Sequence, residues 1–140
     1  MVGETDLRRL LAGMRPVLRP DVFVFATIAG SARRPEGLDP IMTFRESEGL
    51  TLILTEEEAR RANLAATFQC RQITLEIQSS LDAVGFLAAV TAKLAAIGIG
   101  VNPVAAFYHD HLFVPAAHAV DALEALKALA EESASAFARE

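Results

Sequence analysis

The sequence predicts an α+β fold in which short strands, several of them paired as hairpins, are joined by a few amphipathic helices. Three observations support this prediction. Residues 22–28 are almost all β-branched or aromatic, which is typical of a buried strand. Residues 41–54 and 101–114 each contain two apolar segments around a short turn, which predicts two antiparallel hairpins. Elsewhere the apolar residues recur every three or four positions, as on one face of a helix.

The first half of the chain is predicted to contain two helices and three strands. A helix begins at Thr5 or Asp6 and ends before Pro16, with four apolar residues on one face: Leu7, Leu10, Leu11 and Met14. The strand at 22–28 and a loop at 30–39 follow. A hairpin of strands at 41–45 and 50–54 then turns at Gly49. Thr55 and the three glutamates after it predict a helix that ends near Asn63.

The second half is predicted to contain three strands and two helices. Residues 70–78 alternate between apolar and polar, as in a strand with one buried face. After a loop at 79–82, a helix ends at Gly98 and carries apolar residues at helical spacing: Val84, Leu87, Ala88, Leu94 and Ile97. Strands at 101–107 and 111–114 flank a tight turn at His109 and Asp110. A helix covers 118–130, and the tail after it is expected to fray.

The composition argues against several classes of protein. A chain of 140 residues that is 52% hydrophobic and 22% charged can bury a core. Its net charge of −5, with arginines scattered in pairs beside acidic residues, predicts no nucleic-acid partner. The longest apolar stretch, 83–107, is interrupted by Lys93, Asn102 and Pro103, so no membrane span is expected. A polar, acidic start and a single cysteine, Cys70, predict a cytoplasmic protein without an internal disulfide.

Two stretches of the chain resemble each other. Residues 40–59 and 103–119 both contain a strand, a turn, a strand and a helix, and they begin with the similar phrases Pro-Ile-Met-Thr-Phe and Pro-Val-Ala-Ala-Phe. A diverged tandem duplication explains the likeness, although two unrelated apolar hairpins would also look alike. The predicted units are 1–66 and 67–132, followed by a frayed tail at 133–140. In the first unit the loop at 30–39 replaces the helix between the first two strands.

Residues 79–114 contain a short loop, a helix that opens with Val84 and Gly85, a strand and a hairpin. With the strand before it, this order resembles the ACT domain, a regulatory module of aspartokinases and other enzymes that respond to amino acids. Residues 40–46, 48–52 and 108–114 resemble a bacterial family of small stand-alone tandem ACT proteins without an assigned activity. The resemblance implies a ferredoxin-like βαββαβ plait in each of two tandem units, with antiparallel sheets and helices on one face. Val84 is a departure, because the ACT loop usually has Pro before Gly.

The resemblance also implies a binding site for an amino acid or similar small metabolite where two ACT units meet. The matching residues are Ser79, Ser80, Leu81, Asp82, Val84 and Gly85 in the loop, and Val101, Asn102 and Pro103 at the opposing strand start. The helix start would offer free N–H groups to a carboxylate, Gly85 would admit a ligand, and Asn102 can donate and accept hydrogen bonds. Alternatively, the serines only cap the helix, Gly85 only permits close packing and Asn102 belongs to a turn. The charge of Asp82 would also repel a ligand carboxylate.

His109 and His111 lie two positions apart, so on a strand their side chains point to the same face, and they form an alternative metal site. A closed zinc site needs further ligands, and Asp110 is expected at the hairpin tip for turn chemistry alone. The sequence contains no nucleophile elbow and no phosphate loop, so we expect no enzyme and no cofactor. Two hypotheses remain: a non-catalytic sensor of a small metabolite, and a ligand-free interaction protein that forms a homodimer through its sheet edges.

Overall fold

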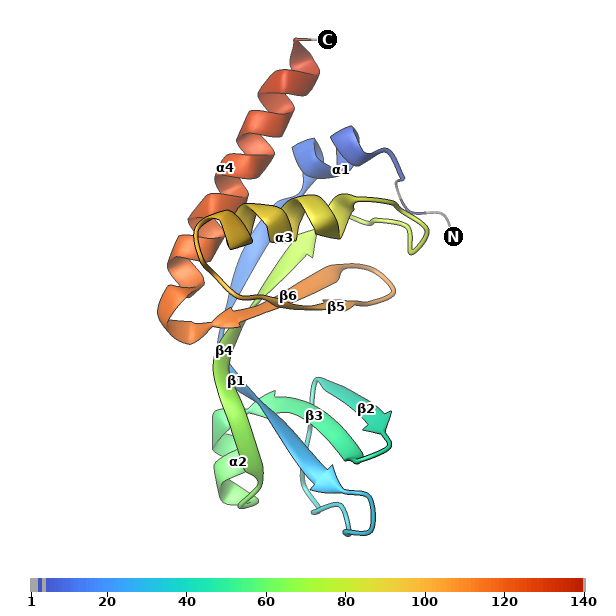
Figure 1. Cartoon of the computed structure of the whole chain (residues 1–140), viewed down its shortest axis with the longest axis vertical. Coiled ribbons are helices and arrows are strands. Elements are labelled where there is room, and N and C mark those ends of the chain that lie inside the picture. The colour runs from blue at the N-terminus through green and yellow to red at the C-terminus, as the bar shows by residue number, and fades with distance from the viewer. Residues whose placement is uncertain (1–2, 4, 140) are drawn as a thin grey trace. The chain divides into compact units, whose positions relative to one another are not determined.

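The computed structural model describes Gly3 and residues 5–139. By its internal contacts the chain divides into two compact units. Unit one contains the chain up to Pro20 and from Arg71 onward, and unit two contains Asp21–Cys70. Two long strands, β1 (Arg15–Ala29) and β4 (Ala65–Glu76), supply residues to both units (Figure 1). Each unit is therefore built from segments that are distant in the sequence.

Unit one has four strands and three longer helices. Its strand order is β1, β4, β6 (Asp110–Pro115) and β5 (Asn102–Ala105), and β5 and β6 form an antiparallel hairpin. The helices are α1 (Leu7–Gly13), α3 (Phe86–Ala96) and α4 (Ala119–Ala138), with a 3-10 turn at Ala116–His118 before α4. The Asp6 carboxylate caps α1 by accepting the N–H groups of Arg8 and Arg9, which confirms one of the two predicted caps.

The core of unit one forms because strands and helices each present one apolar face. Alternate residues of β4 and β6, Ile73 and Leu75 with Leu112 and Val114, are completely buried. They pack with buried residues of the three helices: Leu10, Phe86, Val90, Leu94, Ala122 and Leu126. The helices therefore cover one face of this sheet, as the sequence predicts, and the other face carries polar side chains.

Unit two is smaller and has one helix. Its strand order is β2 (Met42–Glu46), β3 (Gly49–Thr55), β1 and β4, and β3 is antiparallel to both β2 and β1. The helix α2 (Glu56–Arg61) begins with the capping box that the sequence predicts. The Thr55 hydroxyl accepts the Glu58 N–H at 3.2 Å, and the Glu58 carboxylate accepts the Thr55 N–H at 3.4 Å. Buried aliphatic residues form the core: Val24, Ala26, Ile28, Leu52, Leu54 and Ala59.

The structure confirms both predicted hairpins and corrects several element boundaries. β1 begins at Arg15 rather than at residue 22. Pro16 and Pro20 argue against a strand in this part of the sequence. Proline is nevertheless tolerated here because β1 is the edge strand of unit one. β5 ends at Ala105, so the hairpin turn covers 106–109 and not 109–110. The helix predicted to end at residue 130 continues as α4 to Ala138, into the predicted tail at 133–140, and its alanines and glutamates favour a helix.

The helix α3 also differs from its prediction. Val84, which was expected on its apolar face, precedes the helix and is 83% exposed, and Ile97 follows the helix and is 52% exposed. The buried face consists instead of Phe86, Val90 and Leu94. The helix cannot extend toward Val84 because Gly85 has a left-handed backbone conformation, with φ of 89°.

The compact units differ from the predicted sequence units, which divide after residue 66. The long strand β4 begins at Ala65 and continues into unit one, so contacts alone do not separate the chain at that point. In unit two the chain passes from β1 to β2 without a helix among the described residues, as predicted for a truncated copy. None of the described helices is long and apolar enough to cross a membrane.

Candidate functional site

The loop between β4 and α3 borders a hollow of about 150 Å³ in unit one. Its walls come from three places in the chain. The loop contributes Ser79, Ser80, Leu81, Ala83 and Gly85, the first turn of α3 contributes residues 86–88, and the β5–β6 hairpin contributes Ala105 and Asp110. The hairpin reaches the loop because Ala105 and Asp110 are the paired residues next to its turn.

The first turn of α3 gives the hollow a positive pole. Gly85 is the N-cap residue and makes no side-chain capping hydrogen bond. The first hydrogen bond of the helix runs from the Ala89 N–H to the Gly85 carbonyl at 3.0 Å. The N–H groups of residues 86–88 therefore have no carbonyl partner within the helix, and the helix dipole favours an anion beside them. A side chain at Gly85 would be strained at this φ, so the bare cap follows from the residue type.

Asp110 gives the same hollow a negative group. It is the first residue of β6, is only 8% exposed, and accepts a hydrogen bond from the Ser79 hydroxyl at 3.3 Å. Burial raises the pKa of the Asp110 carboxyl, whereas the Ser79 hydrogen bond and nearby His109 act in the opposite direction. The prediction that Asp110 serves only turn chemistry at a hairpin tip is therefore wrong. One hydrogen bond from Ser79 offsets only part of the cost of burying this carboxylate. It is therefore suited to binding a small cationic group.

A second hollow of about 200 Å³ adjoins the first and shares Ser79, Ser80 and Leu81 with it. Asp82 and Phe107 line this second hollow but not the first. Two of its lining side chains are large, apolar and exposed: Leu81 is 70% exposed and Phe107 is 64% exposed. The Phe107 ring contacts the Tyr108 ring edge to face, with ring centroids 4.9 Å apart. Asp82 therefore borders the second hollow and not the first.

The structure brings together part of the predicted ligand-binding set. Ser79, Ser80, Leu81 and Gly85 line the first hollow and Asp82 lines the second, whereas Val84 lines neither. Val101, Asn102 and Pro103 also line neither hollow. They lie at the other end of the sheet, because α3 carries the chain back across it before β5 begins (Figure 1). The opposing wall comes from the end of β5 and the start of β6.

The two serines do not cap the helix, which was the alternative prediction. The Ser79 hydroxyl donates to Asp110, and the Ser80 hydroxyl accepts the Asp82 N–H at 3.0 Å. Sequence reasoning missed Asp110 as a wall residue, together with Ala105 and residues 86–88. The sequence does contain one indication of Asp110: it directly precedes an apolar strand, and an Asp that becomes buried there requires a partner or a function.

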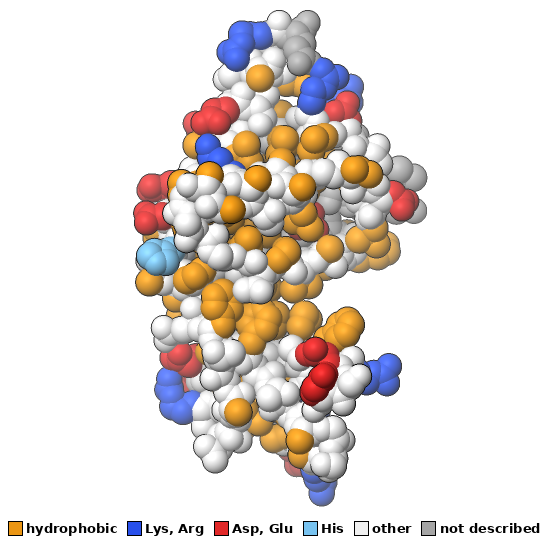
Figure 2. Space-filling model, viewed as in Figure 1, with side chains coloured by type: hydrophobic (Ala, Val, Ile, Leu, Met, Phe, Trp, Pro, Cys, Tyr) orange, Lys and Arg blue, Asp and Glu red, His pale blue; other side chains and the backbone are white. Residues whose placement is uncertain are grey.

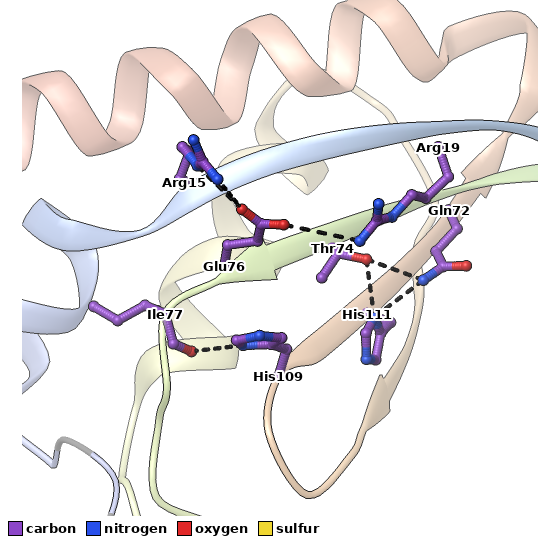
Figure 3. A network of polar contacts seen from close by, with 8 residues as sticks. All are labelled: Arg15, Arg19, Gln72, Thr74, Glu76, Ile77, His109 and His111. Carbon is purple, nitrogen blue, oxygen red and sulfur yellow. Dashed lines mark hydrogen bonds and ion pairs between the residues drawn. The ribbon is translucent and has the colours of Figure 1, made fainter.

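The sheet face opposite the helices of unit one carries a polar network (Figure 3). The His111 ring nitrogen Nδ1 lies 3.0 Å from the Thr74 hydroxyl and 3.1 Å from the Gln72 amide nitrogen, which also donates to Thr74. Burial lowers the pKa of His111, and nearby His109 and Arg19 lower it further. The Gln72 amide nitrogen can only donate, so Nδ1 of His111 accepts and the ring is neutral in this arrangement.

The predicted alternative of a metal site at His109 and His111 gains no support from this network. The rings are neighbours, with centroids 6.4 Å apart. However, Nδ1 of His109 donates to the Ile77 carbonyl at 3.3 Å, and Nδ1 of His111 is engaged as described above (Figure 3). Among the described residues, no group of three or more His, Cys, Asp or Glu is placed to hold a metal ion. Glu76, on the same face, bonds instead to Arg15, which lowers the pKa of its carboxyl.

Comparison with known proteins bears on the fold of the chain. A solved structure from Vibrio cholerae, a protein of unknown function described as a possible transport protein, is 44% identical over 90% of this chain and 97% of that one, with a TM-score of 0.81. A protein from Agrobacterium tumefaciens is 17% identical over 84% and 89% of the two chains, with a TM-score of 0.72. The aspartate kinase regulatory subunit of Thermus thermophilus is 12% identical over 85% and 97%, with a TM-score of 0.65. The last two likenesses show the fold alone.

No curated protein matches the chain. Two family models, both described as the ACT domain, match residues 2–71 and 67–128. Together they span both halves of the chain, including the loop, helix and hairpin that form the hollow of unit one. The chain belongs to the ACT domain family and contains two ACT domains in tandem.

Proposed function

We propose that this protein is a non-catalytic regulatory protein that binds a small amino acid in the first hollow of unit one. The observation that carries the proposal is that an uncapped helix start and a buried carboxylate line one hollow. An amino acid carries one negative and one positive group on adjacent carbon atoms, so it needs opposite charges close together. Family membership supports a regulatory role, as in the aspartate kinase regulatory subunits that share the fold.

The proposed pose follows from the charges of the walls. The ligand carboxylate accepts hydrogen bonds from the N–H groups of residues 86–88, where the helix dipole is positive. The ligand ammonium group binds the Asp110 carboxylate, and the Ser79 hydroxyl holds that carboxylate in place. Binding a cation lowers the pKa of Asp110, which offsets part of the cost of its burial.

The size of the hollow restricts the ligand. The first hollow, at about 150 Å³, is the smaller of the two adjoining hollows. This suits glycine or alanine, which have about five or six non-hydrogen atoms. A larger side chain would have to extend into the adjoining hollow, between Leu81 and Phe107. We therefore expect affinity to fall for acidic side chains, which would lie beside the exposed carboxylate of Asp82.

The exposed apolar rim also bears on the predicted junction between ACT units. Leu81, Val84, Phe107 and Tyr108 are all more than half exposed. Of these, Leu81 and Phe107 line the second hollow. Large exposed apolar side chains beside a hollow are typical of a surface that another chain covers. We include in the proposal that an ACT unit of a second copy of this chain covers the mouth when the ligand is bound.

A thermal-shift series on the wild-type protein tests the proposal. The probes are L-alanine, propionate, which lacks the ammonium group, and L-alaninamide, which lacks the carboxylate. At ten times its Kd, a ligand of the folded state adds about 1.4 kcal/mol, and each kcal/mol raises Tm by about 2–4 °C in a chain near 150 residues. We expect L-alanine to raise Tm and the other two probes to have little effect. No shift with any proteinogenic amino acid at millimolar concentration would contradict the proposal.

A second candidate function is self-association through the edge strand β2, without a ligand. The two edges of the strand order differ: β5 contains Pro103, which cannot donate to a neighbouring strand, whereas β2 contains no proline and its Phe44 is 64% exposed. Antiparallel pairing of two β2 strands about Phe44 would place Thr43 opposite Arg45 of the second copy. No like charges would then lie opposite each other.

Sedimentation equilibrium of the variant Phe44→Lys tests this second function. We expect the wild type to dimerise and Phe44→Lys to be monomeric, because the new charge would lie against its own counterpart. The matched control is Ile97→Lys, which changes another half-exposed apolar residue, outside β2. A wild type that stays monomeric at every concentration, or an equal effect of both variants, would exclude pairing through β2.

A further inference from the structure

Unit two contains a hollow of about 320 Å³ at the place that corresponds to the hollow of unit one. In unit one the hollow lies where the strand β4 ends beside the β5–β6 hairpin, and in unit two it lies where β1 ends beside the β2–β3 hairpin. The walls of the second are different. The side chains that distinguish it are Arg34 from the loop after β1 and Arg45 from β2.

The floor of this hollow is apolar and closely packed. Ile28 of β1 and Leu50 of β3 are paired across the strands, and Arg45 is paired with Leu50 on its other side. Ile28 is 6% exposed and Leu50 packs on the same core. Gly49 allows the hairpin to approach β1, because a Cβ atom there would lie 2.5 Å from the Ile28 carbonyl oxygen. The strand pairing therefore fixes the positions of the residues that form the floor.

The loop that carries Arg34 is anchored at both ends. The Ala32 N–H donates to the Ala29 carbonyl at 2.9 Å, and the Asp39 N–H donates to the Glu58 carboxylate at 2.8 Å. Pro35 restricts Arg34 to an extended backbone. Arg34 is thus positioned by its loop and not only by its own side chain.

The two guanidinium groups at the hollow have no partner in the described part of the chain. The neighbouring Arg33 forms an ion pair with Glu36 at 3.8 Å. Neither Arg34 nor Arg45 makes a hydrogen bond or ion pair with another described residue. Glu46, at the border of the hollow, accepts a hydrogen bond from the Thr51 hydroxyl. The hollow therefore offers two free cationic donors above an apolar floor.

We propose that this hollow is a second binding site, which takes a small organic carboxylate with a branched or linear apolar body. A planar guanidinium group donates two parallel hydrogen bonds to a carboxylate, and two such groups can hold one carboxylate between them. The apolar body would lie on Ile28 and Leu50. The carboxylate of Glu46 at the border disfavours a dianion such as phosphate. No ammonium group is required, which distinguishes this ligand class from the amino acid proposed for unit one.

The test is an NMR titration of the full-length protein with isovalerate. The comparison probes are isovaleramide, which has the same shape without the charge, and inorganic phosphate, which has the charge without the apolar body. We expect saturable shifts of the backbone amides of Gly30, Ala32, Gly49 and Leu50 with isovalerate, and at least tenfold weaker binding of both comparison probes. Equal binding of isovaleramide, or tighter binding of phosphate, would overturn the ligand class.

Three arginine variants separate this site from general electrostatic attraction. Arg34→Gln and Arg45→Gln should each weaken isovalerate binding at least tenfold. Arg33→Gln removes the same charge from the same loop, but outside the hollow, and should change the affinity less than twofold. Equal weakening by all three variants, or no saturable shift in the wild type, would overturn the proposal. Asp110 lines the hollow of unit one and not this one. Asp110→Asn should therefore leave isovalerate binding unchanged, and a failure of the unit one proposal would not affect this test.

Discussion

The hollows of the two units lie at corresponding places but reach a positive charge by different means. In unit one the strand β4 is followed by the helix α3, whose uncapped N-terminus supplies N–H donors without any cationic side chain. In unit two the same position is an anchored loop, and Arg34 and Arg45 supply the cations instead. The paired position next to the hairpin turn also differs, being Asp110 in one unit and Gly49 in the other.

The difference teaches how a duplicated site can change its ligand class. A helix start and a buried acidic residue select a molecule with both charges, whereas two guanidinium groups beside the single exposed carboxylate of Glu46 favour an anion. Losing a helix need not remove an anion site if side chains replace its N–H groups. The space-filling view (Figure 2) shows hydrophobic, acidic and basic side chains on the visible face, with the charged ones mostly toward its periphery.

The largest expected loss of stability comes from a substitution in α3, the helix that lines the hollow of unit one. Leu94 is completely buried in the unit one core, so Leu94→Ala should lower the free energy of unfolding by about 2–5 kcal/mol in urea denaturation. Ile97 follows the same helix and is 52% exposed, so Ile97→Ala should cost less than about 1 kcal/mol. Similar losses for both variants would mean that α3 is not held by the core as described.

A smaller effect is expected in unit two. The Cβ atom added by Gly49→Ala would lie 2.5 Å from the Ile28 carbonyl oxygen, so β3 or β1 must shift. Overpacking of this kind costs about 1–3 kcal/mol, and it should also abolish isovalerate binding. Gly30→Ala is the matched control, because a Cβ atom there would have no neighbour within 4 Å. Wild-type stability of Gly49→Ala would show that the floor of the hollow is not fixed by this contact.

Asp110→Asn should raise stability at neutral pH. An acid whose pKa is higher in the folded state binds more protons when folded, so the wild type loses stability as pH rises through that pKa. Asparagine does not titrate. The variant should therefore unfold at a higher Tm than the wild type at pH 7, and the difference should vanish below the ordinary Asp pKa of about 3.9. Thermal unfolding from pH 3 to 8 checks this, and a variant that is less stable at pH 7 would contradict it.

The smallest expected effect is on the rate at which a disulfide reagent labels the thiol of Cys70. It is buried and donates to the Phe23 carbonyl at 3.4 Å, and burial raises its pKa to about 12. Its thiolate fraction at pH 8 is then roughly a thousandfold below that of an ordinary thiol, so labelling by a disulfide reagent should be slow. Since Cys70 belongs to unit two, Gly49→Ala should accelerate labelling more than Leu94→Ala does. The opposite order would contradict the division into units.

The sequence predicts the elements wherever short-range chemistry decides them. The Thr55 capping box, the two hairpins and the loop that contains Ser79, Ser80 and Leu81 all follow from neighbouring residues. The loop in place of a helix in the first unit is also predicted, because glycine and proline within 30–39 disfavour a helix there. These features depend on residues that are at most a few positions apart.

The walls of the site depend instead on contacts between distant residues. α3 has 11 residues, a length of about 16 Å at 1.5 Å per residue, so it carries the chain to the opposite end of the sheet. The strand start at Val101, Asn102 and Pro103 is thereby placed away from the loop, while Asp110 arrives beside Ser79 through the register of the hairpin. Neither outcome can be predicted from local sequence patterns, because both require the strand pairing to be known.

The central claim is that one hollow binds both charges of a small amino acid, and calorimetric titration with L-alanine tests it most directly. We predict that Asp110→Asn weakens binding at least tenfold. Asp82→Asn removes the same charge from the adjoining hollow and should leave the affinity within twofold of the wild type. NMR should place the bound alanine at the backbone amides of residues 86–88. Equal affinities of Asp110→Asn and the wild type, or shifts that avoid these amides, would contradict the account.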